Sequence, residues 1–354
     1  WSSFHVGKDA TVNFQQPNAQ SSTLNRVNDV QPSQIFGRIT APGEVVLVNP
    51  QGVYFGKSSS VDVGGLVATT HAAGADEYMK GQLKFNRNGA TGSVVNEGEL
   101  RAALSGYIAL LAPEVRNQGV IVANLGTVAL AAGEAYELQF DGKGALSNVR
   151  VTPAAINTLV ENKQAIQAPG GLVIMSALAA SRLQTAVVSN GGRIEATGLV
   201  SRAGRIVLEA TTKLINAGVI SANSGADGSP AGSVSIKAST IENSGTISAA
   251  DLLGSSTVAA NVGRISIEGD LFTQTSSGML DVSSVNTWAG SVSLTLTDSV
   301  YMSGAVLANS VMGSGQSTSY VLGNAVGGQL SLQATRRIDF DSAVLDASGA
   351  DGGG

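Results

Sequence analysis

Residues 45–70 read VVLVNPQGVYFGKSSSVDVGGLVATT, and this stretch decides the fold. It contains three short apolar segments, at 45–48, 52–55 and 61–63, whose length and Val-rich composition are typical of β-strands. The tetrapeptide Asn49-Pro50-Gln51-Gly52 joins the first two segments. Asn at the first position of a turn, Pro at the second and Gly at the fourth are the preferences of a tight type I turn. We therefore predict that the chain reverses its direction sharply at Asn49.

The composition favours strands and turns over helices. Charged residues make up 13% of the 354 residues, which is about half their share in an ordinary soluble domain. The sequence has 44 glycines and many Ser, Thr and Asn residues between short Val, Ile and Leu runs. Because no Pro-rich, Ser-rich or charged linker divides the chain, we expect one continuous architecture.

Charge and residue usage argue against several classes of protein. The 21 basic and 26 acidic side chains give a net charge of −5, and the basic ones are scattered, which argues against nucleic-acid binding. No apolar run approaches the roughly 18 residues that a membrane span requires. The absence of Cys excludes disulfides and thiolate metal sites. Since the first residue is Trp1 and not Met, we expect a mature or excised fragment.

Two glycine-containing motifs recur along the chain and predict a repeat architecture. The first is Asn-x-Gly-x-aliphatic, and the second is Gly-x-aliphatic-x-aliphatic. The last five glycines of the second motif are, by subtraction, 28, 31, 27 and 38 residues apart, a period that indicates a solenoid or an array. The first motif begins at Asn96, Asn117, Asn124, Asn190, Asn216 and Asn243, and the second at Gly106, Gly126, Gly204, Gly232, Gly263, Gly290 and Gly328.

The spacing within each repeat decides between helices and strands. Apolar residues stand at i, i+2 and i+4 between Gly and Asn, whereas helical repeats need them at i, i+3, i+4 and i+7. We therefore predict an all-β fold, a right-handed parallel β-helix (solenoid) with short extra-helical hairpins and one or two short helices. The inward Val, Ile and Leu side chains of one coil would stack on those of the next, about 4.8 Å away.

Three segments depart from the strand pattern. Residues 153–160 begin with Pro153 at the position of a first helical turn, and residues 176–188 are rich in Ala and Leu at helical spacing. We predict that both are short helices that shield an edge or corner of the stack. Residues 70–88 carry five charged side chains, so we predict an exposed hairpin or loop outside the β-helix.

The sequence offers little that is typical of catalysis or metal binding. His5 and His71 are the two histidines, and neither has a second candidate ligand at metal-site spacing. We expect both to be ordinary surface residues. Enzymes built on parallel β-helices gather ionisable groups along one groove, and no such cluster is visible here. We therefore predict no catalytic residue, no cofactor-binding residue and no metal site.

Six motifs in the first 70 residues carry a resemblance to a known family. In order they are WSSFHVG at 1–7, VNFQQP at 12–17, LNRV at 24–27, PSQIFG at 32–37, NPQGVYFG at 49–56 and VGGLVATT at 63–70. In this order they resemble the secretion domain of two-partner-secretion exoproteins, the filamentous haemagglutinin and high-molecular-weight adhesin family. The resemblance is dense over residues 1–130, and residues 151–196 look like segments of the adhesin-type branch.

The sequence departs from the family pattern at two points. The family's turn is usually Asn-Pro-Asn-Gly, and Gln51 replaces the second Asn, which keeps the amide on a longer side chain. The family's second tetrapeptide, which ends in Leu, is not found, and this resembles the adhesin-type rather than the haemolysin-type branch.

The resemblance implies an organisation and a function. Residues 1–150 would be the two-partner-secretion domain, an N-terminal β-helix with capping strands. Residues 151–354 would continue the β-helix repeats as the proximal shaft of a larger exoprotein. The unfolded chain would be addressed in the periplasm to receptor domains of a partner outer-membrane β-barrel transporter. It would then fold outside the cell, secreted or at the bacterial cell surface.

The resemblance also implies a site and further partners. Asn49, Pro50, Gln51 and Gly52 would form the secretion motif, either by contacting the transporter or by supporting the fold. We expect a monomer whose distal part contacts host-cell or biofilm carbohydrate. Two alternatives remain open at this point: a β-helical polysaccharide-degrading enzyme, and a contact-dependent toxin exoprotein whose C-terminal toxin domain is not in this sequence.

Overall fold

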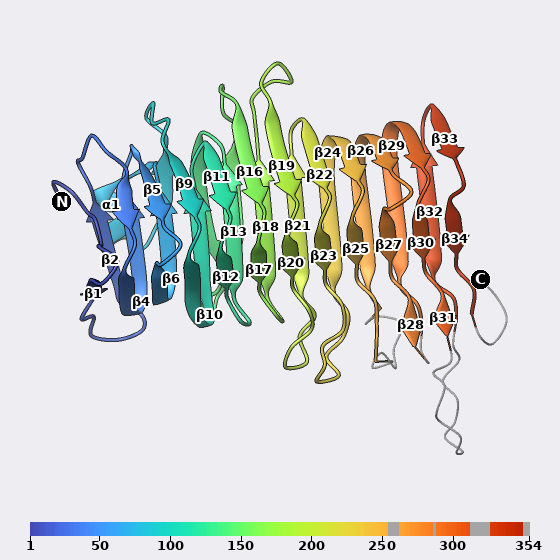
Figure 1. Cartoon of the computed structure of the whole chain (residues 1–354), viewed down its shortest axis with the longest axis horizontal. Helices are drawn as coiled ribbons and strands as arrows, with labels where there is room; N and C mark the ends of the chain where they lie inside the picture. The colour runs from blue at the N-terminus through green and yellow to red at the C-terminus, as the bar shows by residue number, and fades with distance from the viewer. Residues whose placement is uncertain (254–261, 286–287, 312–325, 350–354) are drawn as a thin grey trace. The chain divides into compact units, whose positions relative to one another are not determined.

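The computed structural model describes residues 1–253, 262–285, 288–311 and 326–349 (Figure 1). Nearly all regular structure in this part of the chain is β-strand, as the sequence predicts. The chain divides into two compact units. Unit 1 comprises residues 1–168, 172–192 and 209–212, and unit 2 comprises residues 169–171, 193–208 and 213–354.

The elements have the following bounds. Up to residue 192 they are β1 (Thr11–Asn13), β2 (Ser22–Arg26), β3 (Ser33–Ile35), β4 (Arg38–Val48), β5 (Gly52–Phe55), β6 (Ser60–Thr69), β7 (Ala72–Ala73), α1 (Ala75–Met79), β8 (Lys84–Asn86), β9 (Ser93–Asn96), β10 (Glu99–Leu111), β11 (Glu114–Asn117), β12 (Val120–Val122), β13 (Thr127–Ala132), β14 (Ala135–Phe140), β15 (Leu146–Thr152), β16 (Thr158–Asn162), β17 (Ala165–Gln167), β18 (Leu172–Ala177) and β19 (Ala186–Asn190). Beyond it they are β20 (Arg193–Glu195), β21 (Arg205–Ala210), β22 (Lys213–Asn216), β23 (Val219–Ser221), β24 (Ser233–Asn243), β25 (Thr246–Ser248), β26 (Arg264–Gln274), β27 (Met279–Asp281), β28 (Ser284–Val285), β29 (Ser291–Met302), β30 (Ala305–Leu307), β31 (Ser310–Val311), β32 (Gln329–Ala334), β33 (Arg337–Phe340) and β34 (Val344–Asp346).

Unit 1 is a parallel β-helix, because each strand pairs in parallel with the strand one coil later. One row runs through β4, β6, β10, β13 and β18. A second row runs through β5, β9, β11, β16 and β19. The strands predicted within residues 45–70 are confirmed as parts of β4, β5 and β6. Since β4 and β5 belong to different rows, the turn between them is a corner of the coil and not a hairpin. The predicted reversal of chain direction at Asn49 is therefore wrong.

Unit 2 repeats the same arrangement. One row runs through β20, β23, β25, β27, β30 and β34, all in parallel (Figure 1). Another runs through β24, β26, β29 and β32. The long β24, β26 and β29 each cover two faces of the coil, as β29 shows by pairing with both β32 and β33. The predicted fold class, a parallel β-helix, is therefore confirmed in both units.

The interior of each unit consists of columns of aliphatic side chains. Partners in register across successive coils are all buried and come from the inward positions of the alternating strands. These columns are the physical reason for the repeat, since every coil buries its aliphatic side chains against both neighbours. In unit 1 one column contains Ile39, Val61, Leu100, Ile121 and Ile166. In unit 2 one contains Ile194, Ile220, Ile247, Leu280 and Val306.

A ladder of buried amides accompanies the aliphatic columns in each unit. In unit 1 the side-chain amide of each Asn donates to the side-chain oxygen of the next, at 2.8 Å for every step. The ladder contains Asn96, Asn117, Asn162 and Asn190. In unit 2 Asn216 donates to Asn243 at 2.9 Å and Asn243 to Gln274 at 2.9 Å. The Asn of the first repeat motif thus carries a buried polar column that fixes how one coil stacks on the next.

The glycines of the second repeat motif also stack. A Cβ on Gly106 would lie within 3.0 Å of the carbonyl oxygen of Gly64, and one on Gly126 within 3.0 Å of that of Gly106. The same holds for Gly232 against Gly204. Glycine recurs there because the backbones of neighbouring coils approach too closely for any side chain.

The two predicted helices are wrong. Residues 158–162 form β16, and the segment 176–188 contains the end of β18 at Ala177, irregular backbone and the start of β19 at Ala186. Thr158, Val160 and Asn162 are buried and alternate with outward residues, and β16 pairs in register with β19. Pairing with neighbouring coils therefore overrides the weak helix propensity of these Ala- and Leu-containing segments.

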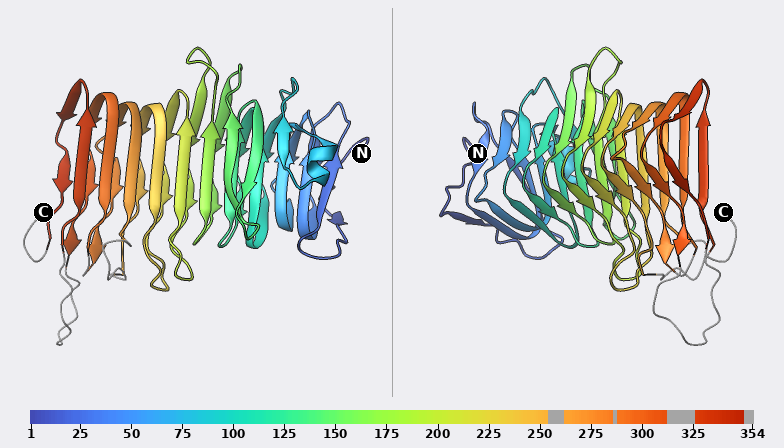
Figure 2. Two further views of the ribbon diagram at one scale, coloured as in Figure 1. Left: turned by 180° about the vertical axis from the view of Figure 1, so that it is seen from behind. Right: turned by 45° about the vertical axis from the view of Figure 1, so that its right-hand side comes forward.

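The segment 70–88 lies outside the β-helix, as predicted, but it is more than an exposed hairpin. It contains β7, the five-residue helix α1 and β8. β8 pairs with β7 and with β14, and β14 pairs with β15, so two excursions of the chain form one four-stranded antiparallel sheet. Figure 2 shows α1 outside the β-helix near the N-terminal strands.

This extra-helical sheet covers an outer face of the β-helix and buries an apolar layer between them. Leu83, Phe85, Tyr136, Leu138, Leu146 and Val149 of the excursions face Val46, Val67, Tyr107, Ala109, Leu111, Ala129, Ala131 and Ile174 of the coils. The alternation of Leu83 and Phe85 with polar neighbours is the sequence feature that explains the burial of this segment.

Candidate secretion site

The predicted turn forms at residues 49–52. The backbone N–H of Gly52 donates to the carbonyl of Asn49 at 2.9 Å, which closes the four-residue turn. The side-chain oxygen of Asn49 also accepts from the backbone N–H of Gln51 at 3.0 Å. Gln51 does not adopt a positive φ, which excludes a type II turn.

The side chain of Asn49 is buried and ties the turn to the preceding coil. Its amide donates to the carbonyl of Gln31 and to the hydroxyl of Ser33, both at 3.0 Å. Its backbone N–H donates to the carbonyl of Thr69 in the following coil, also at 3.0 Å. Asn49 therefore connects three consecutive coils, which the sequence signal for a local turn did not reveal.

Gly52 and the two central residues have different environments. Gly52 is buried with φ +127°, and a Cβ there would lie 2.8 Å from the carbonyl oxygen of Ser93. Pro50 and Gln51 are exposed. The structure thus separates the four predicted site residues into a buried pair, Asn49 and Gly52, that holds the corner, and an exposed pair, Pro50 and Gln51.

The two histidines also differ in environment. His5 is exposed, as predicted, and lies 3.4 Å from the carboxylate of Asp29. The prediction of a surface residue is wrong for His71, which is fully buried. Its Nε2 lies 3.1 Å from the carbonyl of Gly133 and its Nδ1 lies 3.1 Å from the hydroxyl of Thr70. Since a carbonyl only accepts, Nε2 carries the proton and Nδ1 accepts from Thr70.

His71 joins the two excursions of the chain at the edge of the extra-helical sheet. Its ring packs on Tyr136 with 4.5 Å between ring centres, and Arg87 pairs with Glu134 at 2.8 Å nearby. Burial lowers the pKa of His71 to about 4, although the Gly133 carbonyl opposes this shift. The side chain is therefore neutral near pH 7 and has a structural role. The alternation of apolar and polar residues in the sequence did not indicate this role.

No metal-ligating cluster is found in the part of the chain that the structure describes. Groups of three or more His, Asp or Glu side chains in metal-binding arrangement do not occur among these residues. Near the C-terminus Asp339 pairs with Arg337 at 2.6 Å, and Asp346 accepts from Ser348 and Asn309. Each of these carboxylates thus has a protein partner. Within the described ranges, no helix is long and apolar enough to cross a bilayer.

The fold and the corner at Asn49 define a cysteine-free parallel β-helix with an extra-helical sheet. A family model described as the TPS secretion domain matches residues 1–222. The chain therefore belongs to the family of TPS (two-partner secretion) secretion domains, as the sequence motifs predict. Members of this family are exported through a partner transporter of the outer membrane.

Individual relatives agree with this assignment. A heme/hemopexin-binding protein of Haemophilus influenzae (strain ATCC 51907 / DSM 11121 / KW20 / Rd) is 32% identical over 223 residues, which covers 61% of this chain and 24% of that protein. A second Haemophilus influenzae heme/hemopexin-binding protein is 29% identical over 237 residues, covering 61% and 25%. The chain thus spans about a quarter of the length of these relatives.

A solved structure shares the fold. The crystal structure of the HMW1 secretion domain from Haemophilus influenzae matches with a TM-score of 0.82 at 22% identity. The match covers 98% of this chain and 90% of that chain.

Proposed function

We propose that this chain is the N-terminal secretion domain and proximal shaft of a large exported bacterial adhesin. A partner outer-membrane β-barrel transporter with periplasmic receptor domains exports it, and it folds outside the cell. In this proposal residues 1–150 carry the export address and residues 151–354 begin the shaft. The observation that carries the proposal is the family match over residues 1–222. This match favours an exported protein over the polysaccharide-degrading enzyme. A toxin exoprotein would share the secretion domain and would differ in its C-terminal domain.

The physics of the fold suits a chain that must cross a membrane before it folds. Each coil contacts only its neighbours, so structure can grow coil by coil without an external energy source. The aliphatic columns and the amide ladders supply the stability of each new coil as it stacks. Because the sequence has no Cys, no disulfide can lock the chain in the periplasm before export.

The export step is tested by producing the chain with a signal peptide in a bacterium that carries or lacks the partner transporter gene. We expect the folded chain in the medium only when the transporter is present, and degraded or periplasmic chain when it is absent. Equal release with and without the transporter would contradict the proposal. A polysaccharide-degrading activity of the purified chain, measured as sugar release, would favour the enzyme alternative instead.

We also propose that the turn at residues 49–52 acts in export chiefly through its two exposed residues. In the folded coil Asn49 and Gly52 are needed for contacts within the coil, whereas Pro50 and Gln51 are exposed and have no such role. In this proposal Pro50 and Gln51 act on the receptor while the chain is still unfolded. The carbohydrate contact predicted for the distal part of the protein stays a prediction. Binding of heme or hemopexin is a property of the named relatives.

Asn49→Ala is expected to lower the free energy of unfolding by about 2 kcal/mol, because Ser33 and Gln31 lose a buried partner. Urea unfolding of the purified chain measures this loss. Secretion of Asn49→Ala should fall together with its stability.

The matched variant is Pro50→Ala combined with Gln51→Ala, which changes only exposed side chains. We expect its free energy of unfolding to fall by no more than about 1 kcal/mol, the usual cost of removing a proline from a turn, and its export to fall. Normal export of this variant together with normal stability would show that the turn only supports the fold.

A further inference from the structure

A cavity of about 230 Å³ lies in unit 1, between the helix α1 and strands β2, β4 and β14. Its polar lining comes from Ser22, Glu44 and Tyr78, and its apolar lining comes from Met79, Leu83 and Phe140. Met79 is largely exposed at the rim, with 80% of its surface accessible. Neither the aliphatic columns nor the turn at Asn49 involves this cavity.

Two hydroxyl groups donate hydrogen bonds to the carboxylate of Glu44, and a third hydroxyl is bonded to one of these two. The hydroxyl of Ser22 donates to Glu44 Oε1 at 2.6 Å, and the hydroxyl of Tyr107 donates to Glu44 Oε2. Because the proton of Ser22 is used in this way, Ser22 accepts the bond that joins it to the hydroxyl of Tyr78. The hydroxyl protons of Ser22, Tyr78 and Tyr107 are therefore all used, and the polar side chains of the cavity wall present acceptor lone pairs.

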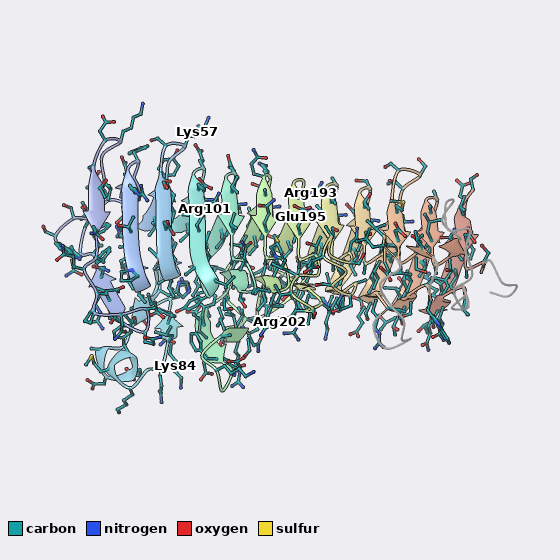
Figure 3. All side chains as sticks on the ribbon, turned by 90° about the horizontal axis from the view of Figure 1, so that it is seen from below. Lys57, Lys84, Arg101, Arg193, Glu195 and Arg202 are labelled. Atoms are coloured by element: carbon teal, nitrogen blue, oxygen red, sulfur yellow. The ribbon has the colours of Figure 1, made fainter. Side chains whose placement is uncertain are left out.

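The charge of Glu44 has no cationic partner within the described residues. Lys84 on the neighbouring β8, labelled in Figure 3, pairs with Glu137 at 3.4 Å. The guanidinium of Arg26 donates to the carbonyl of Ala73 at 2.6 Å. Burial and the negative charge of Glu44 raise the pKa of both Tyr107 and Tyr78. Glu44 is thus a half-buried carboxylate that hydroxyl groups alone stabilise.

The lining determines the chemistry of an occupant. An acceptor-only wall around a carboxylate fits a group that carries donors and positive charge, and Lys and Arg side chains carry donors only. The apolar wall fits the methylene stem of such a side chain, and aromatic rings favour a planar guanidinium above it. The volume lies below the roughly 300–1,000 Å³ of small-molecule sites, so it suits one side chain of a polypeptide.

We propose that this cavity is a docking site for an arginine side chain of a partner polypeptide, which pairs with Glu44 between Tyr78, Leu83 and Phe140. The site exists only when α1 and the extra-helical sheet are folded on the coils, so its partner meets the folded chain. It is independent of the recognition of the unfolded chain during export. When no partner occupies the site, the rim residue Met79 is exposed to solvent.

The test uses the full chain and the peptide acetyl-Gly-Arg-Gly-amide, with the citrulline peptide as the neutral isostere. We expect NMR or calorimetric titration to show at least about tenfold tighter binding of the arginine peptide, weakened by added salt. Glu44→Gln should weaken binding about tenfold, and Tyr78→Phe, which removes one acceptor on the exposed helix, about threefold.

The matched control is Glu97→Gln. Glu97 accepts a hydrogen bond from Tyr54 at 2.9 Å but lines no part of the cavity, so this variant should bind the peptide like the parent chain. If Glu44→Gln loses its fold by urea unfolding, Tyr78→Phe decides the outcome. Equal binding of both peptides, or binding that neither Glu44→Gln nor Tyr78→Phe reduces, would overturn the proposal. A dimer that Glu44→Gln abolishes would assign the site to a second copy of the chain and would also overturn it.

Discussion

Asn117→Ala is expected to lower the free energy of unfolding by about 4 kcal/mol, the largest effect of the variants considered for this chain. The side-chain oxygen of Asn117 accepts from Asn96 at 2.8 Å, and its amide donates to Asn162 at 2.8 Å. It also accepts from the backbone N–H of Gly119 at 3.4 Å and donates to the carbonyl of Ala165 at 3.3 Å. The residue is fully buried, so water cannot replace these partners.

The matched control for this prediction is Asn124→Ala. Asn124 begins the same sequence motif, but its side chain is exposed and only its backbone carbonyl is bonded, to the N–H of Ser105 at 2.9 Å. We expect a change below about 0.5 kcal/mol there. Urea unfolding midpoints, together with hydrogen exchange of the coils around residue 117, measure both variants. Equal midpoints for the two variants would contradict a stabilising role of the ladder.

Acidification is the second large expected effect, and it acts through His71. Its pKa is about 4 in the folded chain against about 6.5 in the unfolded chain, so the unfolded chain binds the proton more readily between these values. The contribution of the neutral His71 ring to the free energy of unfolding is therefore fully present above about pH 6.5 and is lost as the pH drops toward 4. The difference corresponds to about 3 kcal/mol at about 1.4 kcal/mol per pH unit.

The pH dependence is measured as the unfolding midpoint at about pH 7 and about pH 4.5. His71→Gln keeps an amide donor toward Gly133 and cannot be protonated, so it should remove most of the difference attributed to this ring. His5→Gln, at an exposed ring beside Asp29, should retain it. If His71→Gln lost as much stability as the parent chain on acidification, carboxylates would have to explain the loss instead.

The fold class could be predicted because each coil of a parallel β-helix requires the same pattern of residues, so the repeat of the coils appears as a repeat in the sequence. Aliphatic residues at alternate positions became the buried columns, and the recurrent glycines became the close contacts between coils. The two predicted helices failed because local composition at 153–160 and 176–188 says nothing about the strands of adjacent coils. In β16 and β19 those neighbours decide the backbone conformation.

The amide ladder was only partly visible in the sequence. Asn96, Asn117 and Asn190 carry the predicted motif, whereas Asn162 is followed by Lys163 and Gln164 and occupies an equivalent place without it. In unit 2 Gln274 takes the same role with a longer side chain. Asn124 shows the converse, because it carries the motif without joining the ladder. Whether an Asn side chain is buried depends on the residues stacked on it in adjacent coils. The spacing of residues along one strand does not reveal these neighbours.

The candidate site was predicted from the resemblance of its turn residues to the family motif, and the division of these residues into buried and exposed pairs required the structure. The reach of Asn49 to Gln31 and Ser33 depends on how the preceding coil stacks. The carboxylate of Glu44 and the ring of His71 were likewise beyond sequence reasoning. Both depend on two excursions, at 70–88 and 133–152, that meet only in the folded chain.

The antiparallel sheet formed by these two excursions limits the order in which segments of the chain can fold. Arg87 and Glu134 are 47 positions apart, so in the proposed export route β8 could pair with β14 only after both excursions had left the transporter. Until then the apolar outer face of β4 and β6 would be exposed to solvent. In that proposal, closure of this sheet would make return of the chain into the transporter unfavourable. A chain stopped before residue 152 would leave the apolar outer face of β4 and β6 exposed to solvent.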